Sequence, residues 1–278
     1  METDTSAGRG LLKRAQLHVE DTGGDGRPVV LIHGWPLSGD SWSEQVPSLR
    51  DAGYRVIAYD RRGFGRSEKP MTGYGYNTLA DDLHNLLVEL DLTDVTLVGF
   101  SMGGGEVARY CAVHGADRLR SVVFAAAVTP FMLQTEGNPD GPLSKTDAAA
   151  MAGQLTADPG TFYDAFTTEF FSAGGELQVT EQQRQEALAQ CEQASKTAAL
   201  ACMTSFGTTD LRDDLESVTV PTLVLHGDSD ATVPFEGSGK RTHEAIAGSQ
   251  LHVIEGGPHG CNVSHADEFN RALLDFLA

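Results

Sequence analysis

The sequence predicts an α/β fold: a mostly parallel central sheet, helices on both sides of it, and a helical insertion. Short apolar runs rich in β-branched residues alternate with amphipathic helical segments, which is typical of parallel strands joined by right-handed crossovers. This alternation stops in the middle of the chain and resumes later. We therefore expect residues 1–278 to form one domain, with a core at about 17–128 and 218–278 and a helical lid at about 129–217.

Before the insertion, most expected strands are continuous apolar runs, which favours burial on both faces of a sheet. The helix expected at 78–90 carries its leucines on one stripe and begins with Thr78, whose hydroxyl can cap the first turn. The helix expected at 103–116 keeps small residues where it approaches the sheet. The other elements expected here are strands at 17–20, 28–32, 54–58, 94–98 and 119–127 and a helix at 41–51.

The insertion is predicted to form several helices and no good strand. We place it over the carboxyl edge of the sheet, where α/β folds bind their ligands. Its helices are expected around 146–155, 161–171, 180–194 and 198–206. After it, strands are expected at 220–225 and 251–254, and helices near 235–247 and at 266–277.

The charge of the chain excludes some classes of partner. With a formal net charge of −19, the chain would be repelled by nucleic acids and anionic membranes, so neither is expected to bind. No apolar run approaches the roughly 20 residues that a membrane helix needs. Residues 1–10 lack the apolar stretch of a secretory signal, and we expect them to form a frayed polar tail.

The spacing of the cysteines favours a reducing compartment, such as the cytoplasm. Cys111, Cys191, Cys202 and Cys261 are widely spaced and form no C-x-x-C pair, so reduced thiols are favoured over disulfides. No histidine–cysteine cluster has the spacing of a metal site. The sequence therefore predicts a cytoplasmic protein without a bound metal.

Ser101 lies in a Gly99-Phe-Ser-Met-Gly103 pattern between a predicted strand and a predicted helix. A strand that turns directly into a helix strains the backbone at the serine and lifts its hydroxyl above the sheet. Gly99 and Gly103 are small, as so tight a turn requires. The pattern by itself also fits an ordinary glycine–serine loop, so the prediction that Ser101 is a nucleophile depends on the rest of the chain.

A serine nucleophile needs a base to take its proton and a third group to orient that base. In this architecture the acid and then the histidine follow the serine, each just after a later strand. His259 follows the strand at 251–254 in a glycine-rich loop, and we assign it as the general base. Asp230, after the strand at 220–225, is the orienting acid; Asp228 is its rival, which could instead cap its own loop.

The tetrahedral intermediate of acyl transfer needs two hydrogen-bond donors for its oxyanion. The expected donors are the backbone N–H of Met102, directly after the nucleophile, and that of Trp35, in the loop after the strand at 28–32. The ring of Trp35 can line the pocket at the same time.

Five motifs lie at or near predicted strand ends: His33-Gly-Trp-Pro36, Tyr59-Asp-Arg-Arg-Gly-Phe-Gly-Arg-Ser67, Gly99-Phe-Ser-Met-Gly103, His226-Gly-Asp-Ser-Asp230 and Pro258-His-Gly260. Together they resemble the α/β-hydrolase fold. More narrowly, they resemble the bacterial cofactor-free (non-haem) haloperoxidase, perhydrolase and aryl-esterase group. The resemblance runs from about residue 17 to the end of the chain and is weakest in the insertion.

This resemblance implies a catalytic triad of Ser101, Asp230 and His259, oxyanion donors at Trp35 and Met102, and no cofactor. Members of the group hydrolyse small esters. Several also convert a carboxylic acid and hydrogen peroxide to a peracid, which oxidises halide without haem or metal. The group often forms homo-oligomers, so this chain is expected to associate with copies of itself.

The substrate pocket is expected to be small and apolar. Pro36 sets the direction of the Trp35 carbonyl, which in the peroxidase-like members can accept a hydrogen bond from peroxide; the alternative is a rigid loop without catalytic consequence. Ordinary core packing is an equally good account of the lid phenylalanines. The residues expected to line the pocket are Pro36, Val128, Phe131, Phe162, Phe166, Phe206 and Val233.

The sequence thus predicts a serine esterase that acts on small neutral carboxylic esters through an acyl-enzyme and has perhydrolase activity toward short carboxylic acids. The alternatives are amide, lactam or carbon–carbon bond hydrolysis on the same scaffold, or a protein that binds a ligand without catalysis. Haloalkane dehalogenation is disfavoured because Ser101 replaces the aspartate nucleophile which that reaction requires.

Overall fold

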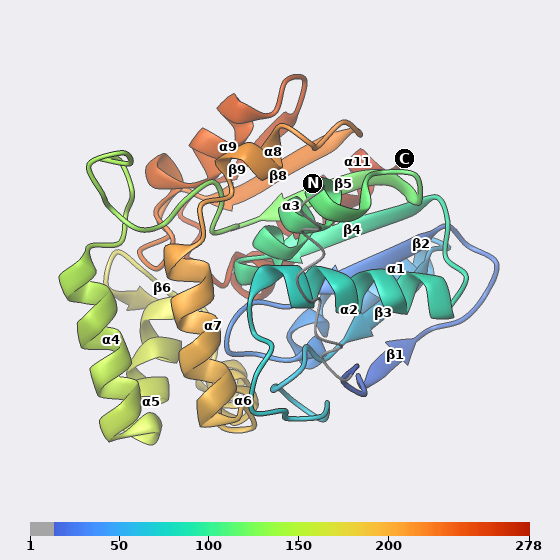
Figure 1. Ribbon diagram of the computed structural model, residues 1–278. Helices are drawn as coiled ribbons and strands as arrows, with labels where there is room; N and C mark the ends of the chain where they lie inside the picture. Colours follow the sequence, from blue (N-terminus) through green and yellow to red (C-terminus); the bar gives the residue numbers. More distant parts are fainter. Residues whose placement is uncertain (1–13) are drawn as a thin grey trace, which may run out of the picture.

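Seven strands form one sheet in the order β1-β3-β2-β4-β5-β8-β9 (Figure 1). This computed structural model describes residues 14–278; the predicted frayed tail lies outside them. β1 pairs antiparallel with β3, and all other neighbours pair in parallel, so the predicted fold class is confirmed. The strands are β1 Val19–Asp21, β2 Pro28–Ile32, β3 Arg55–Tyr59, β4 Val95–Phe100, β5 Leu119–Ala125, β8 Thr222–Gly227 and β9 Gln250–Ile254.

Successive residues of the central strands face opposite sides of the sheet, so the chain has two apolar layers. Val122 of β5 belongs to an apolar cluster with residues of α2 and α3, whereas Val123 belongs to a second cluster that includes residues of α1 and α11. Burial on both sides explains why the central strands are continuous apolar runs. The helices of the core are α1 Gln45–Asp51, α2 Tyr76–Glu89, α3 Met102–His114, α9 Gly239–Ala245, α10 Cys261–Ser264 and α11 Ala266–Leu277; the short helix α8, Arg212–Leu215, lies at the end of the insertion.

Two helix starts differ from the prediction. The helix expected at 78–90 begins at Tyr76, and its N-cap is Gly75, so Thr78 lies inside the first turn and does not cap it. The helix expected at 41–51 is a 3-10 turn, Gly39–Trp42, followed by α1. Pro47 falls in the first turn of α1, where a missing N–H costs no helical hydrogen bond.

The helix expected near 235–247 is also divided. A 3-10 turn, Phe235–Gly237, precedes α9, and Ser238 between them has φ −139° and ψ −83°, which no helix contains. The Ser238 hydroxyl donates to the carbonyl of Pro234 at 2.6 Å and closes the turn. The short helices α8 and α10 were not predicted, because four residues are too few to show a periodic pattern.

The insertion forms four main helices at one end of the sheet (left in Figure 1). Each has a side-chain N-cap: Ser144, Asp158, Thr180 and Ser195 accept hydrogen bonds from backbone N–H groups of the following turn. We call this segment, 129–217, the lid. Its helices are α4 Lys145–Ala157, α5 Pro159–Phe170, α6 Glu181–Glu192 and α7 Lys196–Thr208.

The insertion was expected to carry no good strand, but it contains two very short ones. β6 Ser172–Ala173 and β7 Glu176–Leu177 form a short antiparallel hairpin. Gly174 and Gly175 between them have φ of 59° and 84°, the left-handed conformation that a two-residue hairpin turn requires. Two-residue strands carry no alternating pattern, so only the Gly-Gly pair could have indicated this hairpin.

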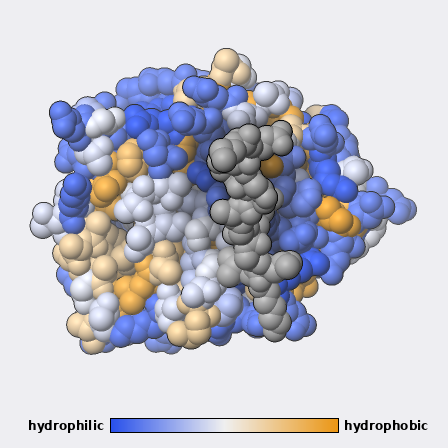
Figure 2. Space-filling view, viewed as in Figure 1, coloured by the Kyte–Doolittle hydropathy of each residue, from blue (hydrophilic) through white to orange (hydrophobic). Residues whose placement is uncertain are grey.

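The surface is largely polar. Figure 2 shows hydrophilic residues over most of the visible face, with apolar ones gathered mainly over the lid. None of the helices within residues 14–278 has the length and apolarity needed to cross a bilayer.

Candidate active site

Ser101 occupies the turn between β4 and α3, with φ 54° and ψ −117°. A non-glycine residue with positive φ is uncommon, and such strain clusters at functional sites. A methyl group on Gly99 would lie 2.5 Å from the Gly103 carbonyl oxygen, and one on Gly103 would lie 2.5 Å from the Ile32 carbonyl oxygen. Only glycine therefore fits on either side of this turn, as the pattern predicts.

The predicted nucleophile, base and acid lie in one chain of contacts. Ser101 Oγ is 3.0 Å from His259 Nε2, and His259 Nδ1 is 2.6 Å from Asp230 Oδ2. All three residues are buried, with 5%, 1% and 5% of their surfaces exposed. This geometry lets His259 accept the serine proton while Asp230 fixes the ring orientation.

The structure separates the two candidate aspartates. Asp230 Oδ1 accepts the Val233 N–H at 2.7 Å, which leaves Oδ2 facing His259. Asp228 is exposed, and its Oδ1 accepts the Gly256 N–H at 2.8 Å. Asp228 therefore joins two loops, and Asp230 alone of the pair contacts the histidine.

The environment keeps Asp230 ionised. Burial alone would raise the pKa of its carboxyl, but the charge of His259 and hydrogen bonds from His226 and His259 outweigh burial and hold the pKa at about 2. Phe100 and Phe170 pack against the His259 ring, with centroids 5.2 and 5.0 Å away. Phe100 thus lies beneath the turn and supports the histidine.

The two expected oxyanion donors belong to residues that adjoin Ser101. Met102 is the first residue of α3, so its N–H has no carbonyl one turn back inside the helix. The loop that carries Trp35 lies directly against the serine, because a methyl group on Gly34 would lie 3.1 Å from Ser101 Cβ. Trp35 and Ser101 line the same small cavity.

The lid fixes the side chain of Trp35. Its indole Nε1 donates to the Ala199 carbonyl of α7 at 3.0 Å. The ring also makes edge contacts with Phe162, Phe166 and Phe206, with centroid distances of 6.1, 5.4 and 5.6 Å. The peptide bond from Trp35 to Pro36 is cis.

An inner cavity of about 50 Å³ adjoins the serine and the histidine. Four of the predicted pocket residues line it: Val128, Phe166, Phe206 and Val233. Sequence reasoning missed four others, because methionine, leucine and threonine at these positions look like ordinary lid and loop residues. These are Met132, Leu143, Met151 and Thr232.

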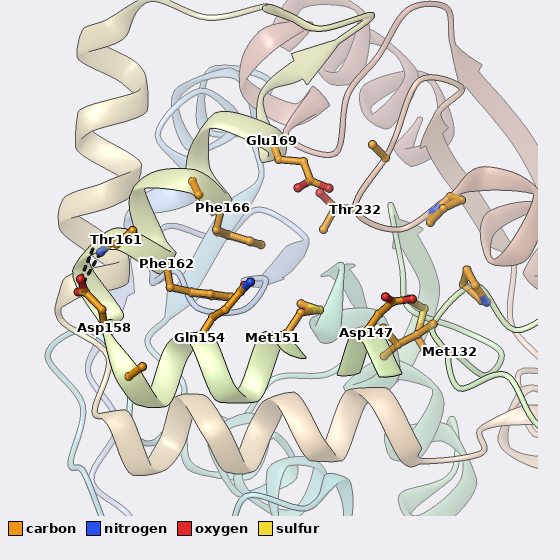
Figure 3. A pocket seen from close by; sticks show the side chains of 16 residues that line it. Met132, Asp147, Met151, Gln154, Asp158, Thr161, Phe162, Phe166, Glu169 and Thr232 are labelled. Carbon is orange, nitrogen blue, oxygen red and sulfur yellow. Dashed lines mark hydrogen bonds between the residues drawn. The ribbon is translucent and has the colours of Figure 1, made fainter. Parts of the chain in front are cut away.

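Figure 3 shows the residues that line an outer cavity of about 660 Å³. This cavity shares residues with the inner one, so the two adjoin. Phe162, predicted for the pocket wall, lines this outer cavity, as do Asp147, Asp158 and Glu169. Among the described residues, no Lys, Arg or His lines the outer cavity. Its charge is therefore negative.

Two predicted pocket residues lie elsewhere. Phe131 lines neither cavity; its ring packs beneath Arg212, whose guanidinium carbon is 5.6 Å from the ring centroid. Pro36 is buried and also lines neither cavity. The sequence alone gives no direction for a loop side chain.

Sequence reasoning also missed a buried charged network beneath the Trp35 loop. Arg61 Nη2 donates to the His33 carbonyl at 2.6 Å, Arg61 Nε pairs with Glu106, and the Tyr59 hydroxyl donates to Glu106 at 3.0 Å. Burial and the Arg61 charge lower the pKa of His33 to about 3. The sequence signal for this network was weak: Arg61 and Glu106 are charged residues beside apolar segments.

The cysteine thiols are buried and unreactive, and the described residues form no metal site. All four cysteines are free and buried, and burial raises the pKa of Cys111 and Cys202 to about 12. Within residues 14–278, no three His, Cys, Asp or Glu side chains are grouped so as to hold a metal ion.

Known proteins resemble this chain over nearly its whole length. The family model described as alpha/beta hydrolase fold matches residues 27–266. A putative non-heme chloroperoxidase from Synechocystis is 46% identical over 94% of both chains. A bifunctional esterase/perhydrolase from Acinetobacter calcoaceticus is 36% identical, over 93% of this chain and 94% of that protein.

A solved structure is also similar. The bromoperoxidase from Bacillus anthracis is 54% identical, superposes with a TM-score of 0.93 and covers 95% of both chains. Since the family model and these relatives span the core and the lid alike, the chain belongs to the α/β-hydrolase family, in its group of non-heme haloperoxidases and perhydrolases.

Proposed function

We propose that this protein hydrolyses small carboxylic esters through an acyl-enzyme on Ser101, and that it also transfers the acyl group to hydrogen peroxide. The observation that carries the proposal is the contact chain from Ser101 Oγ to His259 and Asp230 beside a small cavity. The relatives named above, a chloroperoxidase and an esterase/perhydrolase, support the same chemistry.

The acylation step uses each group once. Ser101 Oγ attacks the ester carbonyl while His259 Nε2 takes its proton, and Asp230 stabilises the imidazolium. The Trp35 and Met102 N–H groups hold the oxyanion of the tetrahedral intermediate, where a single donor typically contributes about 3 kcal/mol. His259 then returns the proton to the alcohol, which leaves, and the acyl group remains on Ser101.

Deacylation repeats the sequence with a second nucleophile. His259 removes a proton from water, which attacks the acyl-enzyme and releases the carboxylic acid. Hydrogen peroxide in the place of water releases a peracid. When a carboxylic acid replaces the ester as the acyl donor, water leaves in the first step and the net reaction is acid plus peroxide giving peracid plus water.

The two cavities suggest how the substrate is divided. The inner cavity has room for a short acyl group beside the serine, whereas the outer cavity is about 13 times larger and can hold a bulky alcohol. The carboxylates of Asp147, Asp158 and Glu169 disfavour an anionic group in the outer cavity. A neutral ester of a short acid fits both cavities.

The alternatives have less support. Amide, lactam or carbon–carbon bond hydrolysis would use the same triad, but the relatives named above are a chloroperoxidase, a bromoperoxidase and an esterase/perhydrolase. A ligand-binding role without catalysis leaves the contact chain at Ser101 unexplained.

One panel of assays tests the proposal. The purified protein should hydrolyse p-nitrophenyl acetate and, in acetate buffer with peroxide and bromide, brominate an indicator dye; Ser101→Ala should do neither. If the wild type hydrolyses no short ester, the esterase part of the proposal is refuted. Ester hydrolysis without acetate-dependent bromination would refute the perhydrolase part alone.

A further inference from the structure

The carboxylate of Asp230 has a second histidine beside it. His226, the fifth residue of β8, is fully buried, and its Nε2 lies 3.2 Å from Asp230 Oδ2. The same nitrogen is 2.8 Å from the carbonyl oxygen of Val233. His226 thus contacts both the acid and the loop that holds the acid.

The surroundings of His226 fix its tautomer and its orientation. Because Nε2 faces a carbonyl oxygen and a carboxylate, it must carry the ring proton. Nδ1 is buried and has no hydrogen-bond partner among the described residues. Gly239 lies against Nδ1, where a methyl group would come within 2.4 Å, and the Phe235 ring packs 5.7 Å away, so the ring is clamped.

We propose that His226 is a positioning residue for the reaction proposed above: its Nε2–H, shared between the Val233 carbonyl and Asp230 Oδ2, holds the carboxylate in line with His259 and offsets part of its charge. The inference rests on the proposed function, since it assigns Asp230 as the acid of that reaction. Asp230 thus faces three N–H groups: those of Val233 and His259 in hydrogen bonds, and that of His226 at 3.2 Å.

The physical reason is the burial of the carboxylate. A buried carboxylate is stable only when hydrogen bonds replace the water that it has lost. Without the donor at His226, the charge on Oδ2 would be offset by His259 alone. The low pKa of Asp230 agrees with this arrangement, because a hydrogen bond from His226 contributes to it.

The same donor should affect the pH dependence of the reaction. The titratable groups around His226 and Asp230 are His259 and the Cys261 thiol. Burial and the charge of Asp230 raise the pKa of the Cys261 thiol. If the His226 donor is removed, Asp230 presents more negative charge to His259 and holds its imidazolium more strongly. The acidic limb of the kcat/KM profile, which reports deprotonation of the base, then moves to higher pH.

The test compares His226→Leu with His226→Gln. Leucine removes the donor, whereas the glutamine amide can place an N–H near the position of Nε2. For p-nitrophenyl acetate we expect His226→Leu to lower kcat about tenfold or more, as for loss of a hydrogen bond to a charged group, with KM within about twofold. The acidic limb should move upward, and His226→Gln should restore most of both losses.

The control is His252→Leu, the same substitution at a half-exposed histidine that pairs with Glu268 on the surface. It should leave kcat and the pH profile unchanged. The imidazole resonances of His259, followed by NMR across the same pH range, give a second readout that needs no turnover. Their titration midpoint should rise in His226→Leu and return toward the wild-type value in His226→Gln.

The outcomes separate the two proposals. A wild type without esterase activity refutes the proposed function, and the NMR titration still tests the contact between His226 and the Asp230–His259 pair. Activity in the wild type, with His226→Leu unchanged in kcat and pH profile, refutes the role of His226. Equal losses in the leucine and glutamine variants, with no shift of the acidic limb or the His259 titration, would mean that His226 only stabilises the fold.

Discussion

Ser101 Oγ and His259 Nε2 lie 3.0 Å apart although 158 positions separate them in the chain. The contact exists because β4 and β9 both end at the same edge of the sheet, with β5 and β8 between them. The loops that follow parallel strands meet at that edge, and this is why residues so distant in sequence converge.

The first prediction distinguishes the two aspartates after β8. Asp230→Asn should lower kcat for p-nitrophenyl acetate on the order of 10⁴-fold, because an amide at this position favours the wrong histidine tautomer. Asp228→Asn should leave kcat nearly unchanged, since Asp228 is exposed and contacts a backbone N–H 28 positions away. Steady-state kinetics of both variants at one pH decides this. The reverse pattern would mean that Asp228 is the acid.

The second prediction concerns the strain at the nucleophile. Ser101 has φ 54° and ψ −117°, a conformation that glycine adopts without penalty. Ser101→Gly should raise the free energy of unfolding by about 1 kcal/mol while abolishing hydrolysis. Ser101→Ala is the matched control, since it also loses the hydroxyl but keeps Cβ. Urea denaturation in which glycine is no more stable than alanine would contradict the proposed strain.

Local sequence patterns specify some features of this fold and leave others open. The β4 strand, the two glycines around Ser101 and the order of acid and base follow from local residue types, and the structure brings these groups together. Phe131 was expected in the pocket, but the position of Arg212 in the folded chain decides where its ring packs. The direction of a loop side chain depends on tertiary contacts, which no local pattern contains.

The same reasoning explains why the Arg61–Glu106 pair was missed. Arg61 follows β3 and Glu106 lies in α3, and each alone looks like an ordinary surface charge. Only the sheet order, which places β2 between β3 and β4, brings the two together.

The third prediction tests that pair. Glu106→Leu should lower the free energy of unfolding by about 3–5 kcal/mol, because it leaves the Arg61 guanidinium buried without its carboxylate. The double variant Arg61→Met/Glu106→Leu should recover part of this loss, since no unpaired charge remains. Urea denaturation at pH 7 measures both. A double variant that is less stable than Glu106→Leu would show that packing, and not charge, controls the loss.

The fourth prediction is a pH dependence of stability. The pKa of His33 is lowered from 6.5 to about 3, so between these values the unfolded chain binds a proton there that the folded chain does not. Stability contributed by neutral His33 is therefore present above pH 6.5 and is lost as the pH falls toward 3, with a slope of at most about 1.4 kcal/mol per pH unit. His33→Gln cannot titrate, so its stability should fall less steeply over this window. Parallel slopes in urea denaturation would contradict the assignment.

The last prediction concerns the division of the substrate between the two cavities. Phe206 lines only the inner cavity, which is about 50 Å³, whereas Phe162 lines only the outer one. Phe206→Ala should enlarge the acyl site and raise kcat/KM for p-nitrophenyl butyrate relative to the acetate by about tenfold or more, since butyrate has two more methylenes than acetate and one accommodated methylene contributes roughly 1–3 kcal/mol. Phe162→Ala removes the same ring from the outer wall and should leave the ratio of butyrate to acetate unchanged. Both rings contact Trp35, so a general loosening of the Trp35 loop would change both variants alike. A ratio that rises only in Phe162→Ala would place the acyl group in the outer cavity and reverse the proposed orientation of the ester.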